Sequence, residues 1–404
     1  MPRTILKLAG AAALAAVSAG HAMAQDNPVT IGVLTDTSSI YTDLTGTGSI
    51  TAAEMAVEDF GGTVNGREIN VISADHGNNA DRGAQIARGW LDEDGVDAIV
   101  DVPNSAVALA VNQIVRDKNG VMLVSGAATT QLVREQCSPN TILWTIDTYG
   151  LASGTTRATL EIGGDSWFYL TADYAFGHDM EKTGGEIVKE AGGKVVGSIR
   201  HPINNADFSS FLLQAQASGA NVIALANAGA DFQNALKQAA EYRITRGGQR
   251  VVAMVAYITD IRALGTDVAG GLYLSEPFYW NLNDGTRAFS ERFAARMDGK
   301  MPTSMQAGTY SAVMHYLKSI DGMDDIKDGR AVVAKMKSMP VSDTLFGDGI
   351  IRPDGRKLHP QNLFQVKTTE ERTSEWDLYK PLTSVPGEEA WVPMNVEACP
   401  MAAE

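Results

Sequence analysis

Two successive alternations of short β-strand patterns and amphipathic helix patterns constrain the fold of this chain more than any other feature. In the first alternation the apolar runs VTIGVL, EINVISA, DAIVDV and GVMLV are separated by stretches such as SITAAEMAVEDF, in which apolar residues recur at every third or fourth position. After TILWTIDTYG the alternation starts again with SWFYLTA, KVVGSI, NVIALA, RVVAMV and GLYLS. Strands that alternate with helices pair in parallel and carry helices on both faces. The sequence therefore predicts an α/β protein with two doubly wound parallel-sheet lobes.

The length of the chain and the positions of its turns suggest where these lobes begin and end. With 404 residues, the chain exceeds the ~150 residues of a typical domain. A mostly helical section begins at Pro277, and NLFQVK and EWDLYK then read as a hairpin. The crossings near Thr145–Thr148 and Glu276–Pro277 lack a linker composition, so we expect them to act as hinges. We predict an N-terminal lobe of residues 26–146 and 277–340, a C-terminal lobe of residues 147–276 and 341–385, and a tail of residues 386–404.

The N-terminal residues 1–24 have the pattern of a secretory signal peptide. Arg3 and Lys7 precede an apolar run, and Ala22 and Ala24 frame a cleavage site of the A-x-A type before Gln25. The alternative is a membrane anchor, but the apolar run is shorter than the ~20 residues that a span needs. We therefore expect an exported protein.

The charge balance of the chain argues against nucleic acid as a partner. There are 48 acidic residues and 33 basic ones, so the formal net charge is −15. Binding to phosphate groups and to anionic membrane surfaces relies on clustered Lys and Arg. The composition therefore disfavours both kinds of partner and leaves a small-molecule ligand open.

The two cysteines, Cys137 and Cys399, are far apart in the sequence. In an oxidising compartment the simplest interpretation is a disulfide that ties the C-terminus back to the first lobe. The alternative is two free, buried thiols. Their wide separation argues against a local metal site, and we expect no bound metal.

The sequence contains none of the common catalytic templates. There is no H-E-x-x-H, no G-x-x-x-x-G-K-S/T, no G-x-S-x-G and no pair of C-x-x-C units, and GTGSIT lacks the third glycine of a dinucleotide fingerprint. The histidines beyond the leader occupy unrelated contexts; these are His76, His178, His201, His315 and His359. We therefore predict a protein that is no enzyme and needs no cofactor.

Two strands end in small residues that suit a ligand. The strand Ala98–Val102 runs into Pro103, Asn104 and Ser105, and GVMLV runs into SGAATT, which contains Ala127, Ala128 and Thr129. Parallel sheets bind ligands beyond the carboxyl ends of their strands, where free N–H groups and helix N-termini favour an anion. We predict that these strand ends hold a carboxylate. The alternative is that Asn104 is only a helix cap and SGAATT only a turn.

Several longer stretches resemble one protein family. VTIGVLTDTSSIYTDLTGTGSITAAEMAVEDFGG resembles the opening strand, loop and first helix of the periplasmic solute-binding proteins of branched-chain amino acid type ABC importers, which share the type I periplasmic-binding fold. VMLVSGAATTQL is similar to their strand followed by S-x-A-A-T, and FYLTADYAFGHDM to their strand followed by Tyr-x-x-G. The resemblance runs from about Val29 to Ile320. It implies two lobes joined by a hinge, a periplasmic location, a small-molecule ligand and a membrane permease as partner, with a monomer sufficient for the task.

The resemblance also implies roles for individual residues. In the first lobe, Ser105, Ala127 and Thr129 would hold the ligand carboxylate, with Tyr41 nearby. Tyr174 would reach in from the second lobe, and Ala228 and Gly229 would supply backbone contacts. The remaining candidates are aromatic: Tyr149 at the first crossing, and Phe278, Tyr279 and Trp280 in EPFYWN, of which Phe278 is the preferred one. Packing of these aromatic residues at the hinge is the alternative interpretation.

The chain departs from the family pattern at one important place. Amino-acid binders of this family carry an acid that pairs with the ligand ammonium, and Tyr257 occupies its approximate position here. A buried cation without a partner is costly, so we favour an aromatic or other organic acid as the ligand. SADHGNNADRG, TADYAFGH and IDTYG also resemble a branch of the family that includes binders of aromatic acids. Asp231 or Asp260 could still serve as the missing acid, in which case the ligand is a branched-chain or other amino acid.

The sequence leaves two further functions open. The same lobes could present a bound ligand to a membrane receptor, as in a sensory protein. An exported hydrolase on an α/β fold would need a nucleophile with a base in reach, which no motif in the sequence indicates.

Overall fold

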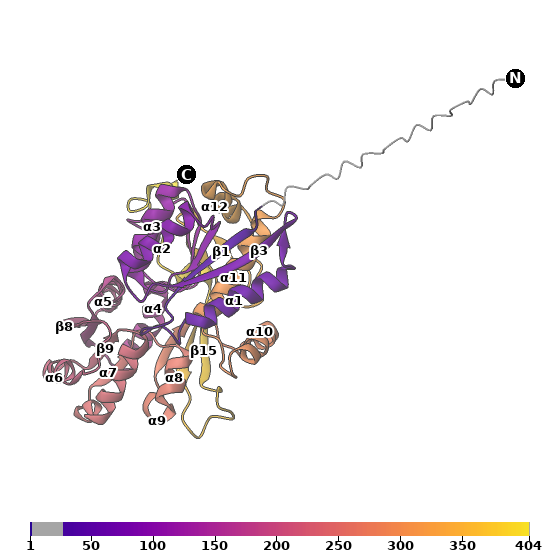
Figure 1. The fold of residues 1–404 in the computed structure, drawn as a ribbon. Helices are drawn as coiled ribbons and strands as arrows, with labels where there is room; N and C mark the ends of the chain where they lie inside the picture. The colour runs from indigo at the N-terminus through magenta and orange to yellow at the C-terminus, as the bar shows by residue number, and fades with distance from the viewer. Residues whose placement is uncertain (2–26, 404) are drawn as a thin grey trace.

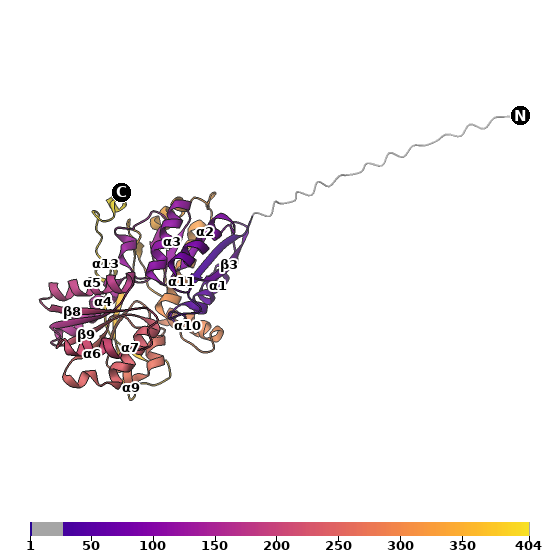
Figure 2. The ribbon, with the colours of Figure 1, turned by 60° about the vertical axis from the view of Figure 1, so that its left-hand side comes forward.

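The computed structural model describes Met1 and residues 27–403 (Figure 1). The predicted signal peptide, apart from Met1, lies outside the described residues. Among the helices of the described part of the chain, none combines the length and the hydropathy that a membrane-spanning helix requires. Two lobes lie side by side, one with α1, α2 and α3 and the other with α5, α6 and α7 (Figure 2).

The first lobe is built on a six-stranded sheet with the strand order β2-β3-β1-β4-β5-β6. All neighbours are parallel except the β2–β3 hairpin. Strand β1 is buried along its whole length, as expected for a parallel strand covered on both faces. The strands are β1 (Val29–Thr35), β2 (Thr63–Val64), β3 (Arg67–Asp75), β4 (Ala98–Asp101), β5 (Met122–Val124) and β6 (Thr141–Leu143).

Helices cover both faces of this sheet and enclose two hydrophobic clusters. Tyr316 and Trp144 belong to the cluster under α1 and α11, and Trp90 and Val111 belong to the cluster under α2 and α3. The helices of this lobe are α1 (Gly46–Phe60), α2 (Ala80–Asp92), α3 (Ser105–Lys118), η1 (Thr130–Val133), α10 (Asp284–Arg296), α11 (Ser304–Ile320) and α12 (Gly329–Ser338).

The second lobe is built on a four-stranded parallel sheet with the order β10-β9-β7-β8. Its strands are β7 (Ser166–Ala172), β8 (Lys194–His201), β9 (Val222–Ala226) and β10 (Arg250–Ala253). Its helices are α4 (Thr148–Glu161), α5 (Ala175–Glu190), α6 (Ser209–Ala217), α7 (Gly229–Glu241), η2 (Ile244–Gly247), α8 (Ile258–Leu264) and α9 (Thr266–Ala269). The two lobes confirm the predicted fold class.

The stretch GLYLS does not extend this parallel sheet, although its place in the alternation suggested that it would. It forms β11 (Tyr273–Glu276), which pairs antiparallel with β14 (Gln361–Val366), and β14 pairs antiparallel with β15 (Tyr379–Val385). Strand β11, which ends at the second crossing, therefore belongs to a separate three-stranded sheet with the order β11-β14-β15. A period of two residues identifies a strand but not its partner, which is why the sequence did not show the change.

The segment after α12 packs against the first lobe. Val341 and Ile351 belong to the same hydrophobic cluster as Trp144, and the short hairpin of β12 (Ile350–Ile351) and β13 (Lys357–Leu358) lies beside β6 through a bridge between Leu143 and Arg356. The predicted division had placed residues from 341 onward in the C-terminal lobe. We propose instead that residues 341–358 belong to the N-terminal lobe, and keep the other boundaries as predictions.

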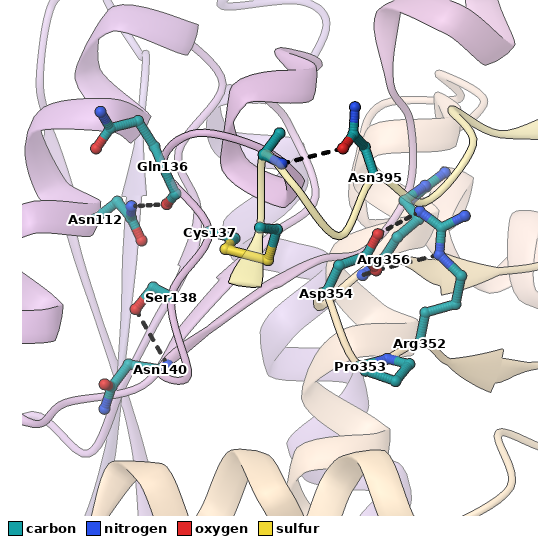
Figure 3. The surroundings of a disulfide bond; sticks show 12 residues. Asn112, Gln136, Cys137, Ser138, Asn140, Arg352, Pro353, Asp354, Arg356 and Asn395 are labelled. Carbon is teal, nitrogen blue, oxygen red and sulfur yellow. Dashed lines mark hydrogen bonds and ion pairs between the residues drawn. A yellow bond between two sulfur atoms is a disulfide. The ribbon is translucent and has the colours of Figure 1, made fainter. Parts of the chain in front are cut away.

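A disulfide and a buried tryptophan attach the C-terminal tail to the rest of the molecule. A disulfide joins Cys137 to Cys399 with a Cα–Cα distance of 5.8 Å, which confirms the expected pairing (Figure 3). Between α13 (Gly387–Ala390) and η3 (Pro400–Ala403), the tail buries Trp391, whose indole N–H donates to the carbonyl oxygen of His359 at 2.6 Å. The tail is therefore an ordered part of the molecule.

Candidate functional site

A small cavity lies between the lobes at the carboxyl ends of the parallel strands. Its walls are formed by Tyr41, Pro103, Gly126, Ala128, Ile146, Tyr174, Phe176, Ala228, Val255, Tyr257 and Met305. All but one of these residues follow the ends of strands β1, β4, β5, β6, β7, β9 and β10, where doubly wound sheets bind their ligands. The cavity volume is about 10 Å³, enough for about one water molecule. The lobes are therefore closed on one another.

The floor of the cavity depends on a close approach of two loops in the first lobe. A Cβ atom at Gly126 would lie 2.6 Å from the Cα of Pro103 and 2.9 Å from the Oδ1 of Asp101, so only glycine fits there. The carbonyl oxygen of Ala128 accepts a hydrogen bond from the backbone N–H of Thr148 at 2.8 Å. These contacts hold the SGAATT loop against the start of α4, at the first crossing between the lobes.

Strand β4 ends in a strained backbone just before Pro103. Asp101 has φ 79° and Val102 has φ 50°, and a β-branched residue rarely adopts this left-handed conformation. Backbone hydrogen bonds hold it in place, since the N–H of Val102 donates to Leu34 O at 2.9 Å and that of Gly126 donates to Asp101 O at 3.0 Å. Strain of this kind concentrates at ligand sites, because the surrounding structure must stabilise it.

Five of the predicted site residues line the cavity: Tyr41, Ala128, Tyr174, Ala228 and Tyr257. Others lie beside its walls. Asn104 caps α3 by accepting hydrogen bonds from Ala106 N at 2.9 Å and Val107 N at 3.2 Å, and Ser105 begins that helix. Thr129 caps η1 through its hydroxyl, which accepts from Gln131 N at 3.3 Å.

Ala127, Gly229 and Tyr149 take other positions near the cavity. Ala127 is buried in the cluster under α2 and α3. Tyr149 packs between that cluster and a second one, which contains residues of both lobes, among them Tyr41 and Tyr169. Gly229 marks a contact between the lobes, since its φ is 59° and a Cβ there would lie 2.3 Å from the carbonyl oxygen of Ile40.

Phe278 lies away from the cavity. It packs against Phe289 and Phe346, with ring centroids 6.3 Å and 6.0 Å away, in a cluster under α10. Tyr279 and Trp280 also pack elsewhere, where both donate hydrogen bonds to Trp376 O, at 3.1 Å and 2.8 Å. The geometry of these three aromatic residues agrees with the packing interpretation.

Six residues of the wall carried no prediction: Pro103, Gly126, Ile146, Phe176, Val255 and Met305. Most of them flank the strand ends that the sequence had indicated, and Phe176 follows Tyr174 closely in FYLTADYAFGHDM. Met305 comes from α11, far along the chain, and no local pattern could have placed it here.

The residues of the cavity wall that have polar side chains are three tyrosines. Tyr41 of the first lobe and Tyr174 of the second share a hydrogen bond between their hydroxyls, which closes the site. Burial raises the pKa of Tyr41, Tyr174 and Tyr257 above the ordinary value. All three are therefore neutral near pH 7 and can donate a hydrogen bond to an anion.

Carboxylates lie behind this wall and are already bonded to the protein. Asp231 accepts from Asn205 N at 2.7 Å and Asn204 N at 2.9 Å, and burial raises its pKa to about 6. Asp260 accepts from Tyr257 N at 3.0 Å and from a side-chain amide at 2.7 Å, and burial raises its pKa to about 6 as well. Neither of the two carboxylates lines the cavity.

Comparisons with known proteins agree with this architecture. A model of the periplasmic binding protein family matches residues 28–371. The Leu/Ile/Val-binding protein homolog 6 of Brucella melitensis is 25% identical over 258 residues, which span 63% of this chain and 66% of that protein.

Solved structures extend the comparison to nearly the whole chain. A periplasmic binding protein from Burkholderia mallei is 44% identical, with a TM-score of 0.88 over 90% of this chain and 96% of its own. A branched-chain amino acid ABC transporter ligand-binding protein from Burkholderia xenovorans is 39% identical, with a TM-score of 0.79 over 90% of this chain and 97% of its own. A solute-binding protein from Rhodopseudomonas palustris, solved with 4-hydroxybenzoate, is 19% identical with a TM-score of 0.81 over 91% and 99% of the two chains, and shows the shared fold alone.

The family model spans most of the chain, and a solved relative is 44% identical over 90% of it. This chain therefore belongs to the periplasmic binding protein family, and its resemblance to the solute-binding proteins of branched-chain amino acid type ABC importers is confirmed.

Proposed function

We propose that this protein captures a small organic acid, with an aromatic carboxylate preferred, between its two lobes. One observation carries the proposal. Among the described residues, the cavity wall contains neutral tyrosine hydroxyls and apolar side chains and no Asp, Glu, Lys or Arg. Neither an ammonium nor a carboxylate would meet a charged partner there, but phenolic hydroxyls are better donors than acceptors, so those of Tyr41, Tyr174 and Tyr257 suit a carboxylate.

The apolar part of the wall suits a ring. Phe176, Ile146, Val255 and Met305 line the same cavity as the tyrosines, and aromatic ligands gain binding energy from apolar contacts of this kind. A protein of the same fold from Rhodopseudomonas palustris was solved with 4-hydroxybenzoate, so this compound is a suitable first probe of the proposal. In the closed arrangement the cavity of about 10 Å³ is too small for a ring, so binding would require the lobes to separate and the Tyr41–Tyr174 hydrogen bond to break.

Membership in the family supports the remaining parts of the proposal. We propose that residues 1–24 direct the chain to the periplasm, where the monomer delivers its ligand to the permease of an ABC importer. We also propose that it has no catalytic activity and no cofactor, in keeping with relatives that are described as binding proteins. A sensory role with a membrane receptor would use the same site and differ only in the partner.

One observation favours a second candidate ligand. The charge of Asp231 contributes to the raised pKa of both Tyr41 and Tyr174, after the larger effect of burial, so this carboxylate lies close behind them. A rearrangement on opening could bring Asp231 to a ligand ammonium. The ligand would then be an amino acid, as the name of the Brucella melitensis relative suggests.

A thermal-shift screen of the mature protein tests the choice between these ligands. The compounds are benzoate, 4-hydroxybenzoate, short organic acids and leucine. Ligand at a hundred times its dissociation constant should add about 2.7 kcal/mol to the free energy of unfolding. A shift with the aromatic acids and none with leucine supports the proposal. A shift with leucine alone would overturn it in favour of the amino acid, and Asp231→Asn should then abolish the leucine shift.

A further inference from the structure

Asp179 joins the two lobes through its carboxylate. It lies on α5 of the second lobe and is only 7% exposed. Its Oδ2 accepts from the backbone N–H of Thr130 at 2.7 Å, and both carboxylate oxygens lie 3.0 Å from the Thr130 hydroxyl, which donates to them. The hydroxyl of Thr148 also donates to Oδ2, at 2.9 Å. All three donors lie outside α5, in η1 of the first lobe and at the first crossing.

These contacts connect two opposite walls of the ligand cavity. On one side, Thr130 ends the SGAATT loop, whose Ala128 lines the cavity. On the other side, Asp179 lies about one helical turn after Tyr174 and Phe176, which also line the cavity. Because Asp179 bonds the SGAATT loop to α5, it also fixes the distance between the two cavity walls that this loop and the start of α5 form.

The start of η1 does not need this carboxylate as a cap. Thr129 already supplies a local cap through its hydroxyl, which accepts from Gln131 N at 3.3 Å. Thr148 is likewise tied to the loop by its own backbone N–H, which donates to Ala128 O at 2.8 Å. Hydrogen bonds to a buried carboxylate are stronger than those between neutral groups. The contribution of Asp179 is therefore the link between the lobes.

We propose that Asp179 is a positioning residue, which holds the loop Ser125–Thr130 of the first lobe against α5 of the second lobe in the closed arrangement. The inference rests on the function proposed above and adds a regulator of how long the lobes stay closed on a ligand. It predicts that neutralising Asp179 speeds ligand release more than it slows ligand capture, since most changes within one interface act on dissociation.

The test compares Asp179→Asn with Glu186→Gln, which removes an exposed carboxylate from the same helix. An asparagine side chain offers one acceptor oxygen in place of two, so it cannot replace every bond at Thr130 and Thr148. Without ligand, hydrogen exchange of a peptide covering residues 125–133 should speed up about tenfold in Asp179→Asn and stay unchanged in Glu186→Gln. With 4-hydroxybenzoate as the probe, stopped-flow fluorescence should show dissociation about tenfold faster, with association within about twofold of the wild type.

Two results would overturn the inference. One is unchanged exchange at residues 125–133 in Asp179→Asn, and the other is an equal rise over both lobes, which would indicate general destabilisation. If Asp179→Asn does not fold, Thr148→Val removes one donor and should give a smaller rise in exchange at the same peptide; no rise there also counts against the inference. Failure of the wild type to bind 4-hydroxybenzoate would instead count against the proposed ligand class, because the exchange measurement needs no ligand.

Discussion

The hinge and the ligand cavity are adjacent and both buried, yet their polar groups are of opposite kinds. Ile146 lines the cavity, and the next residue, Asp147, belongs to the hinge. There the Nε of Arg356 lies 3.0 Å from the Oδ2 of Asp147 with both side chains fully buried, and its Nη1 donates to Leu143 O at 2.8 Å. The guanidinium also stacks over the ring of Trp391 at 3.9 Å. The cavity wall, by contrast, holds neutral tyrosine hydroxyls.

The charged groups of the hinge stabilise the fold, whereas the hydroxyls of the cavity wall are available to bind a ligand. A buried charge is costly without a partner of opposite charge, and in the hinge Arg356 and Asp147 pair with each other. A buried hydroxyl that loses its hydrogen bond costs less free energy than a buried charge that loses its partner, and a hydroxyl can exchange one partner for another. We therefore expect mutations in the hinge to change stability most, and mutations in the cavity to change ligand affinity most.

Arg356→Met should have the largest effect on stability. It leaves the buried carboxylate of Asp147 without its counter-ion and removes the stacking on Trp391. Breaking a buried pair in this way should lower the free energy of unfolding by about 3–5 kcal/mol, measured by urea denaturation. Arg287→Met, at an exposed pair on α10, is the control and should change it by less than about 1 kcal/mol. Equal effects of the two variants would mean that the buried pair in the hinge contributes no more to stability than an exposed pair.

Removal of the disulfide should have the next largest effect. Cys137→Ser together with Cys399→Ser frees the tail that carries Trp391 and opens a loop that spans 262 residues. We expect a loss of about 2–4 kcal/mol in the free energy of unfolding. Denaturation of the wild type with and without reductant provides a matched comparison. If the reduced protein were as stable as the oxidised one, the packing of the tail alone, and not the disulfide, would stabilise this region.

The acid at the second crossing should make stability depend on pH. Glu276 accepts from Tyr379 Oη at 2.8 Å and Ser304 Oγ at 2.9 Å, and burial raises its pKa to about 8 from the ordinary 4.5. The folded state then binds a proton more tightly than the unfolded state, so stability should fall as the pH rises from about 5 to 8. Glu276→Gln should flatten this fall by about 1 kcal/mol or more. A fall of the same size in both proteins, measured by urea denaturation across this range, would assign it to other groups.

A tyrosine in the cavity wall should have the smallest effect on stability and a clear effect on binding. Tyr257→Phe removes one neutral hydroxyl, so affinity for 4-hydroxybenzoate, measured by calorimetry, should weaken by about 0.5–1.5 kcal/mol. The free energy of unfolding should change by less than that. Tyr242→Phe, at a residue that is 47% exposed, is the control and should change neither quantity. A larger loss of stability than of affinity would make Tyr257 a structural residue like those of the hinge.

Much of the fold and part of the site were predictable from local patterns. The strand runs and the single pair of cysteines led to two parallel-sheet lobes and one disulfide, and a cavity lies beyond the strand ends where the small residues predict a ligand. Ala128 came from a strand end, and the resemblance to the family implied Tyr41 and Tyr174; all three line the cavity. The resemblance also implied Phe278, and this residue lies in a separate cluster.

What the sequence determined by itself is therefore local: the alternation of strands and helices, and the ends of the strands. Only the tertiary structure decided which distant residues meet, such as Met305 with Tyr257 in the cavity wall, Arg356 with Asp147 in the hinge, and Asp179 with Thr130 between the lobes. The physical reason is that periodicity reports which side of an element is buried but not what covers it. Burial and charge pairing, which decide the strength of these contacts, depend on that covering partner.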